Sequence, residues 1–251
     1  MIELLTGIPG SGKTFYLVSK LCTDMKFIKR YNIIVHNIEG LKNELLYENI
    51  RFKVSNSSNI FKQIPLKIFR HEFVNIEYSH VYFVDSLLFR LYPEYNPRLD
   101  RVLFIIDECH REPGLHNNYG KSSRELIKQQ SIGEFFSYHR HFGFDFILCC
   151  QNISLLNKQI KPLIEMEINA LAVNWLPIKM FMYKVYVNGM SIKTFTLKPQ
   201  RYIYNFYQSS LLHIENKKYY SLFVGVAIAV LIFLIMLIWL LNNFSEMGLL
   251  K

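Results

Sequence analysis

The sequence has little charge, few cysteines, and no internal repeat or low-complexity tract. Only 20% of its 251 residues are charged, whereas 51% are hydrophobic. This length suits one sizeable α/β domain plus a membrane anchor and is too short for two ordinary domains beside it. The four cysteines lack C-x-x-C spacing, which argues against a metal site and predicts small buried apolar residues. They are Cys22, Cys109, Cys149 and Cys150.

We also expect no cleavable leader, because Glu3 and a glycine-rich stretch occupy the positions where a charged and then apolar leader would lie. Charge is absent again from Leu222 to Leu241, twenty residues without charge, Asn, Gln or Pro. A helix over this stretch would be about 30 Å long, the thickness of a bilayer's hydrocarbon core. We therefore predict a transmembrane helix there. The alternative is a fully buried core helix, which is seldom apolar all round for so long.

Basic residues near this span predict its orientation and the domain boundaries. Lys217 and Lys218 precede the span, whereas Lys251 is the one basic residue among the ten that follow it. Positive charge favours the cytoplasmic side. We expect a cytoplasmic domain over residues 1–216, a juxtamembrane segment and span over 217–241, and a short far-side tail over 242–251. The net charge of +9 lies on the cytoplasmic part, where it suits anionic lipid or nucleic acid and also occurs on ordinary basic proteins.

The most specific motif follows the apolar run at residues 2–6. Eight consecutive residues fit the G-x-x-x-x-G-K-[ST] pattern of a phosphate-binding loop: Gly7, Ile8, Pro9, Gly10, Ser11, Gly12, Lys13 and Thr14. Glycines let successive backbone amides point at phosphate oxygens. Lys13 would reach the β- and γ-phosphates of ATP, and the Thr14 hydroxyl would hold Mg²⁺. The alternative is a glycine-rich turn with no ligand.

Two further stretches supply candidate hydrolytic residues. The apolar run at residues 102–106 predicts a central parallel strand, and it ends in Asp107-Glu108, the pattern of a Walker B strand. Asp107 would join Thr14 in the Mg²⁺ shell, and Glu108 would polarise the attacking water. Gln151 follows a predicted strand over residues 144–150, so it would lie at the carboxyl edge of the sheet and sense the γ-phosphate or orient water. Otherwise it is a turn glutamine.

These patterns predict an α/β fold of the P-loop NTPase class, with a mainly parallel sheet, a C-terminal antiparallel hairpin and one transmembrane helix. Expected helices cover residues 13–29, 41–46, 122–141 and 155–164, and Pro162 would kink or shorten the last. Expected strands cover residues 2–6, 32–37, 51–54, 102–106, 144–150 and 170–175, the first two forming a βαβ unit. Asn188-Gly189 predicts the hairpin turn between strands 179–187 and 190–197.

A third stretch, His-Arg-His-Phe-Gly-Phe-Asp at residues 139–145, leads into Gln151. Together with the phosphate loop and residues 104–108, it resembles the zonula occludens toxin (Zot) family, which includes the assembly ATPases of filamentous phages. The resemblance implies an inner-membrane ATPase that works with a phage-encoded outer-membrane channel to extrude single-stranded DNA while coat proteins assemble around it. It also makes Arg140 a candidate catalytic arginine acting in trans. The alternative is that His139, Arg140 and His141 form a basic helix terminus, where cations favour the carboxyl end of the helix dipole. Motors of this type complete each site with a neighbouring subunit, so a homo-oligomeric ring is expected.

The sequence differs from the family in one respect, and two other functions are alternatives to this hypothesis. Family members commonly carry a sizeable domain beyond the membrane, where we expect only residues 242–251, so the resemblance does not carry over toxin activity or direct docking to a periplasmic channel. One alternative is an ATP-dependent DNA translocase of the conjugation or segregation type. The other is a nucleotide-switched membrane scaffold without sustained turnover. Glu108 argues against the scaffold, because a switch needs no water activator.

Overall fold

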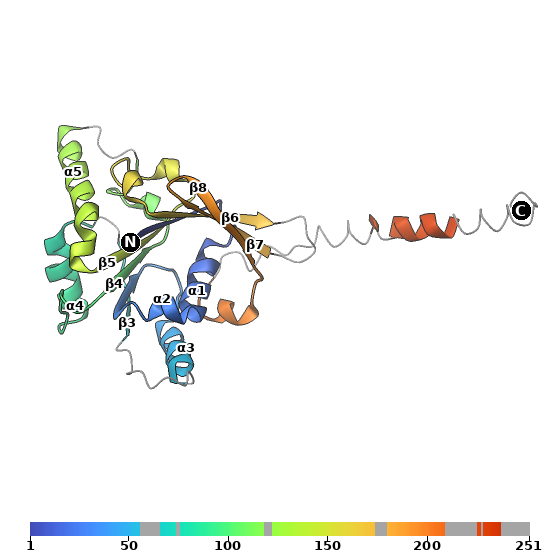
Figure 1. Ribbon diagram of the computed structural model, residues 1–251, viewed down its shortest axis with the longest axis horizontal. Helices are drawn as coiled ribbons and strands as arrows, with labels where there is room; N and C mark the ends of the chain where they lie inside the picture. The colour runs from blue at the N-terminus through green and yellow to red at the C-terminus, as the bar shows by residue number, and fades with distance from the viewer. Residues whose placement is uncertain are drawn as a thin grey trace, which may run out of the picture. The chain divides into compact units, whose positions relative to one another are not determined.

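The computed structural model describes residues 1–55, 66–73, 76–117, 122–173, 180–208, 225–226 and 228–236. One compact unit contains the described residues up to 208, and those from 225 onward belong to a second unit. The first unit is built around an eight-stranded sheet with the order β3-β2-β4-β5-β1-β6-β7-β8 (Figure 1).

The sheet is parallel over most of its width and antiparallel at one side. Its strands are β1 (Ile2–Thr6), β2 (Ile33–His36), β3 (Lys67–Arg70), β4 (Val102–Ile106), β5 (Phe144–Cys149), β6 (Met166–Val173), β7 (Met180–Val187) and β8 (Met190–Leu197). Strands β1 to β6 run parallel to one another, and β7 and β8 follow β6 in antiparallel order. The predicted α/β fold with a mainly parallel sheet is confirmed, and so is the hairpin. Residues 174–175 of the strand predicted over 170–175 lie outside the described residues.

Helices cover both faces of this sheet (Figure 1). One face carries α1 (Lys13–Thr23), α2 (Met25–Ile28), α3 (Asn43–Ser55) and the 3₁₀ turn η6 (Arg201–Asn205). The other carries the π-helical stretch η1 (Tyr82–Leu88), α4 (Phe89–Leu91) and α5 (Ser123–Tyr138). Side chains alternate between the two cores as the pleat requires: Leu5 and Leu103 pack on the first face, and Leu4 and Phe104 on the second.

Short 3₁₀ turns fill several connections. They are η2 (Cys109–Arg111), η3 (His139–Phe142), η4 (Ile153–Leu155) and η5 (Lys161–Leu163). The predicted helix over residues 155–164 is therefore wrong. The side chains of Asn152 and Asn157 accept hydrogen bonds from Ser154 N at 2.8 Å and Gln159 N at 2.9 Å. Such local bonds compete with helix formation, and Pro162 removes another donor.

Two further predictions near the first helix are corrected. The helix predicted over residues 13–29 is divided into α1 and α2, because the Asp24 side chain accepts a hydrogen bond from Phe27 N at 3.0 Å and starts a new helix. The strand predicted over residues 51–54 is wrong, since these residues belong to α3. Leu46 and Ile50, four residues apart, are both buried in the same core, which is the helical spacing.

The order of the strands differs from a simple βαβ unit. Strands β1 and β2 are not neighbours, because β4 and β5 lie between them. Parallel strands end at the same edge of a sheet, so this order brings the carboxyl ends of β1, β4 and β5 side by side. The phosphate loop, Asp107 and Gln151 follow these three ends, and we call this side of the sheet the carboxyl edge.

The four cysteines are buried, as predicted. Burial raises the pKa of the Cys109 and Cys149 thiols. Neutral thiols behave as small apolar side chains, which agrees with their place in the core.

Among the described residues, no helix is long and apolar enough to cross a membrane. Only residues 225–226 and 228–236 of the span predicted over 222–241 are described, and both stretches are helical. Their large apolar side chains, including Leu234 at 49% and Phe233 at 65%, are all exposed. The transmembrane helix stays a prediction.

Candidate nucleotide-binding site

Three glycines shape the phosphate loop between β1 and α1. Gly7, Gly10 and Gly12 have φ values of +146°, +83° and +91°, which other residues rarely adopt. A Cβ atom at Gly7 would lie 2.5 Å from the backbone oxygen of Ala170, and one at Gly12 would lie 2.5 Å from the ring of Phe181. Strands β6 and β7 therefore leave no room for a side chain at either position.

Strands β5 and β7 hold this loop in place. Gly7 N donates a hydrogen bond to the carbonyl of Gln151 at 3.2 Å, and the Tyr183 hydroxyl donates to the carbonyl of Gly12 at 2.9 Å. Tyr183 is fully buried, and its ring lies 5.0 Å from that of Tyr16 in α1. The role of Tyr183 is not predicted from the sequence, because the pattern of a hairpin strand gives no sign of the distant loop it contacts.

One cation and one orphan hydroxyl lie inside the loop. Lys13 is 6% exposed, and its Nζ donates to the carbonyl of Gly7 at 2.7 Å and to that of Ile8 at 3.4 Å. Ser11 is fully buried, and its Oγ has no hydrogen-bond partner among the described residues. A buried polar atom without a partner costs about 1 to 3 kcal/mol. A glycine cradle with an ordered ammonium and an orphan hydroxyl therefore fits a polyphosphate.

Asp107 joins the phosphate loop to the end of β4. Thr14 Oγ1 donates to Asp107 Oδ2 at 3.3 Å. Burial raises the pKa of Asp107, and the neighbouring Glu108 carboxylate raises it further. Asn37, beyond the end of β2, fixes the backbone of Asp107: its Nδ2 donates to Asp107 O at 3.0 Å, and its Oδ1 accepts from Asp107 N at 2.6 Å. Asn37 is another residue that the sequence patterns do not single out.

Thr14 and Asp107 present the oxygen donors that Mg²⁺ prefers. Within the described part of the chain, no three His, Cys, Asp or Glu side chains gather into a metal site. In nucleotide sites, Mg²⁺ takes one or two protein ligands and completes its shell with phosphate oxygens and water. The two residues therefore fit a magnesium ion that arrives with a nucleotide.

Glu108 starts the turn after β4 in a left-handed backbone conformation, with φ +51°. Its Oε2 lies 3.3 Å from His110 Nε2 and 4.0 Å from Arg111 Nε. Partial burial lowers the pKa of His110, so its ring is neutral at neutral pH. The turn thus folds His110 back against the carboxylate next to Asp107, a contact that the sequence does not predict.

The last two predicted site residues lie at opposite edges of the sheet. Gln151 follows β5 and lies beside the phosphate loop at the carboxyl edge. Arg140 precedes β5 at the other side, which we call the amino edge, where its Nη2 pairs with Glu165 Oε2 at 2.5 Å. A strand of six residues spans about 20 Å. Arg140 therefore does not reach the phosphate loop of its own chain, and its role in trans stays a prediction.

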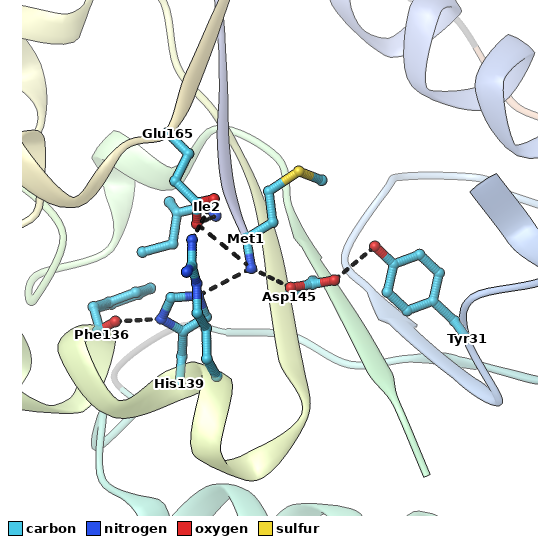
Figure 2. A network of polar contacts seen from close by, with 8 residues as sticks. Met1, Ile2, Tyr31, Phe136, His139, Asp145 and Glu165 are labelled. Carbon is cyan, nitrogen blue, oxygen red and sulfur yellow. Dashed lines mark hydrogen bonds and ion pairs between the residues drawn. The ribbon is translucent and has the colours of Figure 1, made fainter. Parts of the chain in front are cut away.

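A polar network lies at the amino edge (Figure 2), and Arg140 joins it through Glu165. The Met1 amino group contacts Asp145 and lies 3.1 Å from His139 Nε2. Asp145 also accepts a hydrogen bond from the Tyr31 hydroxyl at 2.9 Å. His139 and Asp145 thus tie the start of β5 to neighbouring elements, whereas the side chain of Arg140 remains 65% exposed.

A family model described as zonular occludens toxin (Zot) matches residues 1–213. The chain belongs to the Zot family. No curated protein gives a match.

Three solved structures are similar to this Zot-family chain at low identity. The N-terminal domain of zonular occludens toxin from Neisseria meningitidis is 18% identical with a TM-score of 0.49, and the match covers 82% of this chain and 98% of that one. The genome packaging NTPase of Sulfolobus turreted icosahedral virus 2 in complex with ATP-gammaS is 15% identical with a TM-score of 0.45, covering 79% and 97%. A KaiC-like protein from Pyrococcus horikoshii is 11% identical with a TM-score of 0.43, covering 78% and 83%.

The Zot-family chain therefore has one edge at which most of the predicted site residues meet. Lys13, Thr14, Asp107, Glu108 and Gln151 lie at the carboxyl edge. Their individual roles in binding and hydrolysis remain predictions.

Proposed function

We propose that this chain is a membrane-anchored ATPase motor that powers the assembly and export of a filamentous phage. The observation that carries the proposal is the 3.3 Å contact between Thr14 and Asp107, which are 93 residues apart in the sequence. This contact joins a phosphate loop to the end of an acidic strand, and Glu108 lies next to it. Membership of the Zot family supports the phage-assembly part of the proposal.

The phosphate loop would bind ATP through its backbone amides and the amino end of α1. Lys13 would exchange its bonds to the loop carbonyls for bonds to the β- and γ-phosphates. Ser11 Oγ would gain the partner that it lacks among the described residues. The glycines at positions 7, 10 and 12 would let the backbone approach the phosphates closely.

Thr14 and Asp107 would hold Mg²⁺, which neutralises charge that develops on the transferred phosphoryl group. Glu108 would polarise the attacking water from its place beside Asp107. Gln151 would orient that water or sense the γ-phosphate, because it follows the strand next to the phosphate loop. In a homo-oligomeric ring, Arg140 of one copy would complete the site of a neighbouring copy.

The membrane part of the proposal rests on residues 222–241. This stretch carries no charge, and its described apolar side chains are exposed and so are available to lipid. We place it in the inner membrane of the bacterial host, with residues 1–216 in the cytoplasm. The family resemblance supplies the partners: phage coat and assembly proteins, an outer-membrane channel, and single-stranded DNA as cargo.

The variant Lys13→Ala tests the proposal in the full chain, purified in detergent and assayed with ATP and Mg²⁺. We expect turnover to fall about 100-fold or more, because a preorganised cation at the phosphates is lost. Lys158→Ala is the control, since Lys158 is exposed on a turn outside the loop. Equal rates for wild type and Lys13→Ala would contradict the proposal.

The same assay separates the alternatives. Nucleotide binding without turnover in every oligomeric state would favour the nucleotide-switched scaffold. Stronger stimulation of ATP hydrolysis by duplex than by single-stranded DNA would favour a translocase of the conjugation or segregation type.

A further inference from the structure

Three arginines gather at the amino edge, opposite the phosphate loop. Arg30 follows α2, Arg101 precedes β4 and Arg140 precedes β5. All three are exposed, although they come from distant parts of the sequence. They line one cavity of about 440 Å³, together with residues at the starts of β1 and β5. The sheet topology therefore builds one positively charged hollow from separate loops.

Backbone hydrogen bonds join these loops into one surface. Asn32 N, two residues after Arg30, donates to the carbonyl of Arg101 at 3.0 Å. Val102 N donates to the carbonyl of Gly143, three residues after Arg140, also at 3.0 Å. Backbone hydrogen bonds thus hold the three segments that carry the arginines against one another.

Two carboxylates also line the cavity, and both are engaged (Figure 2). Glu165 pairs with Arg140, and Asp145 is bound by the Tyr31 hydroxyl and the Met1 amino group. The other two arginines of the cavity have no acidic partner among the described residues. The hollow therefore presents positive charge that an anionic ligand would neutralise.

Two exposed rings flank Arg140 in the sequence, and neither belongs to the lining of the cavity. Tyr138 ends α5 and is 56% exposed, and the exposed ring of His141 lies 5.8 Å from it between centroids. Cations interleaved with exposed rings are how proteins bind single-stranded nucleic acid, since arginines contact phosphates and bases stack on the rings. An anionic lipid surface would satisfy the charge but would leave the rings and the hollow unused.

We infer that this amino-edge face binds a single-stranded polynucleotide, with Arg30 and Arg101 on its phosphates and Tyr138 against its bases. The inference rests on the proposed function, which gives the chain a single-stranded cargo, and it adds the face of the domain that holds it. Strands β1 and β5 would connect the two activities, because each starts at the cavity and ends beside the phosphate loop.

The test measures fluorescence anisotropy of a labelled oligothymidylate with the full chain in detergent, for wild type and Arg30→Gln/Arg101→Gln. We expect the double variant to bind about 10-fold more weakly, and the slope of log affinity against log salt to fall by about 1.4, since each phosphate contact on a single strand contributes about 0.7. The control Lys42→Gln/Arg90→Gln removes the same charge from exposed residues outside this cavity and should keep wild-type binding.

The variant Tyr138→Ser tests the stacking part separately. We expect about a 5-fold or larger loss of affinity with an unchanged salt slope, because stacking on one ring is worth about 1 to 3 kcal/mol per base and releases no counterions. Thermal unfolding of each variant confirms that the fold is kept.

Wild-type binding by the Arg30→Gln/Arg101→Gln variant, or an equal loss in the control, would overturn the inference. Hydrolysis by the wild type without oligonucleotide binding would overturn it while leaving the proposed ATPase intact. Arginine-dependent oligonucleotide binding without hydrolysis would instead overturn the proposed function. If the two arginines mediate binding to phosphatidylglycerol vesicles and not to the oligonucleotide, the face is a lipid-binding surface and the inference is wrong.

Discussion

The carboxyl edge of the parallel sheet is built mainly from backbone atoms, whereas the amino edge is built mainly from side chains. At the carboxyl edge, the candidate ligand site is mainly backbone: a loop whose glycines lie against Ala170 and Phe181 with no spare volume. At the amino edge, the candidate site is made of exposed side chains on loops joined by backbone hydrogen bonds. One edge depends on close packing and the other on charge. A single added methyl group should therefore damage the first, whereas the second should lose charges without unfolding.

The largest expected effect is that of Gly12→Ala. Its Cβ would lie 2.5 Å from the Phe181 ring, and its φ of +91° is strained for alanine. We expect a loss of about 3 kcal/mol or more in the free energy of unfolding, since both overpacking and backbone strain act. Urea unfolding of the full chain in detergent measures this, and ATP binding should be lost as well.

The matched control is Gly189→Ala in the hairpin turn. Its φ is also positive, at +75°, but nothing lies within 4 Å of the added Cβ. Strain alone should cost about 1 kcal/mol. Equal losses for the two variants would show that packing against β7 does not restrict the loop, and the contrast between the edges would fail.

A change of pH should have an intermediate effect on the free energy of unfolding, through His36 at the carboxyl end of β2. This residue is fully buried; its Nε2 lies 2.7 Å from Asn43 Oδ1, and its Nδ1 accepts from Ile38 N at 3.2 Å. Burial lowers the pKa of His36 to about 4. The unfolded chain takes up this proton near pH 6.5, so the stability that the neutral ring contributes is complete above about pH 6.5 and is lost as the pH falls toward about 4.

Between about pH 7.5 and about pH 5, this single group should lower the free energy of unfolding by about 2 kcal/mol. His36→Gln should remove that part of the pH dependence, as measured by urea unfolding at each pH. If the free energy of unfolding of His36→Gln changes with pH as steeply as that of the wild type, His36 is not the cause of this pH dependence.

The smallest expected effect is a difference in stability between variants of two asparagines, which join β2 to β4 at opposite edges. Asn37 makes two hydrogen bonds to the backbone of Asp107, at 3.0 and 2.6 Å, whereas Asn32 Oδ1 accepts one from Arg101 N at 3.4 Å. We expect Asn37→Ala to cost about 1.5 kcal/mol and Asn32→Ala about 0.5 kcal/mol or less, because each good bond contributes about 1 kcal/mol. Thermal unfolding ranks them, and a larger loss for Asn32→Ala would reverse the comparison.

The parts of the site that the sequence predicts are those in which chemistry demands given residue types in consecutive positions. The phosphate loop and Asp107-Glu108 are such stretches, and the fold brings them together. Asn37 and Tyr183 escape prediction because their partners lie 70 and 171 residues away, and no local pattern marks such a pair. The position of Arg140 likewise needs the sheet: its distance from the phosphate loop follows from the direction of β5.

The fold is predicted best where one pattern dominates. Strand β4 is a continuous apolar run, and the hairpin has an Asn-Gly turn. Basic and apolar residues alternate over residues 51–54, as they do in a strand. These residues are nevertheless helical, because the helix buries Leu46 and Ile50 against the sheet. The order of the strands depends on packing between distant helices, which single-sequence patterns do not contain.

The hydrogen bond from Tyr183 to Gly12 couples the hairpin to the phosphate loop. Because the ring of Phe181 also fills the space at Gly12, the phosphate loop is held against β7 by packing as well as by a hydrogen bond. In the proposed motor, a shift of the phosphate loop during nucleotide turnover would move β7 and the tip at Asn188-Gly189 with it. A spectroscopic probe at that exposed tip would record this movement.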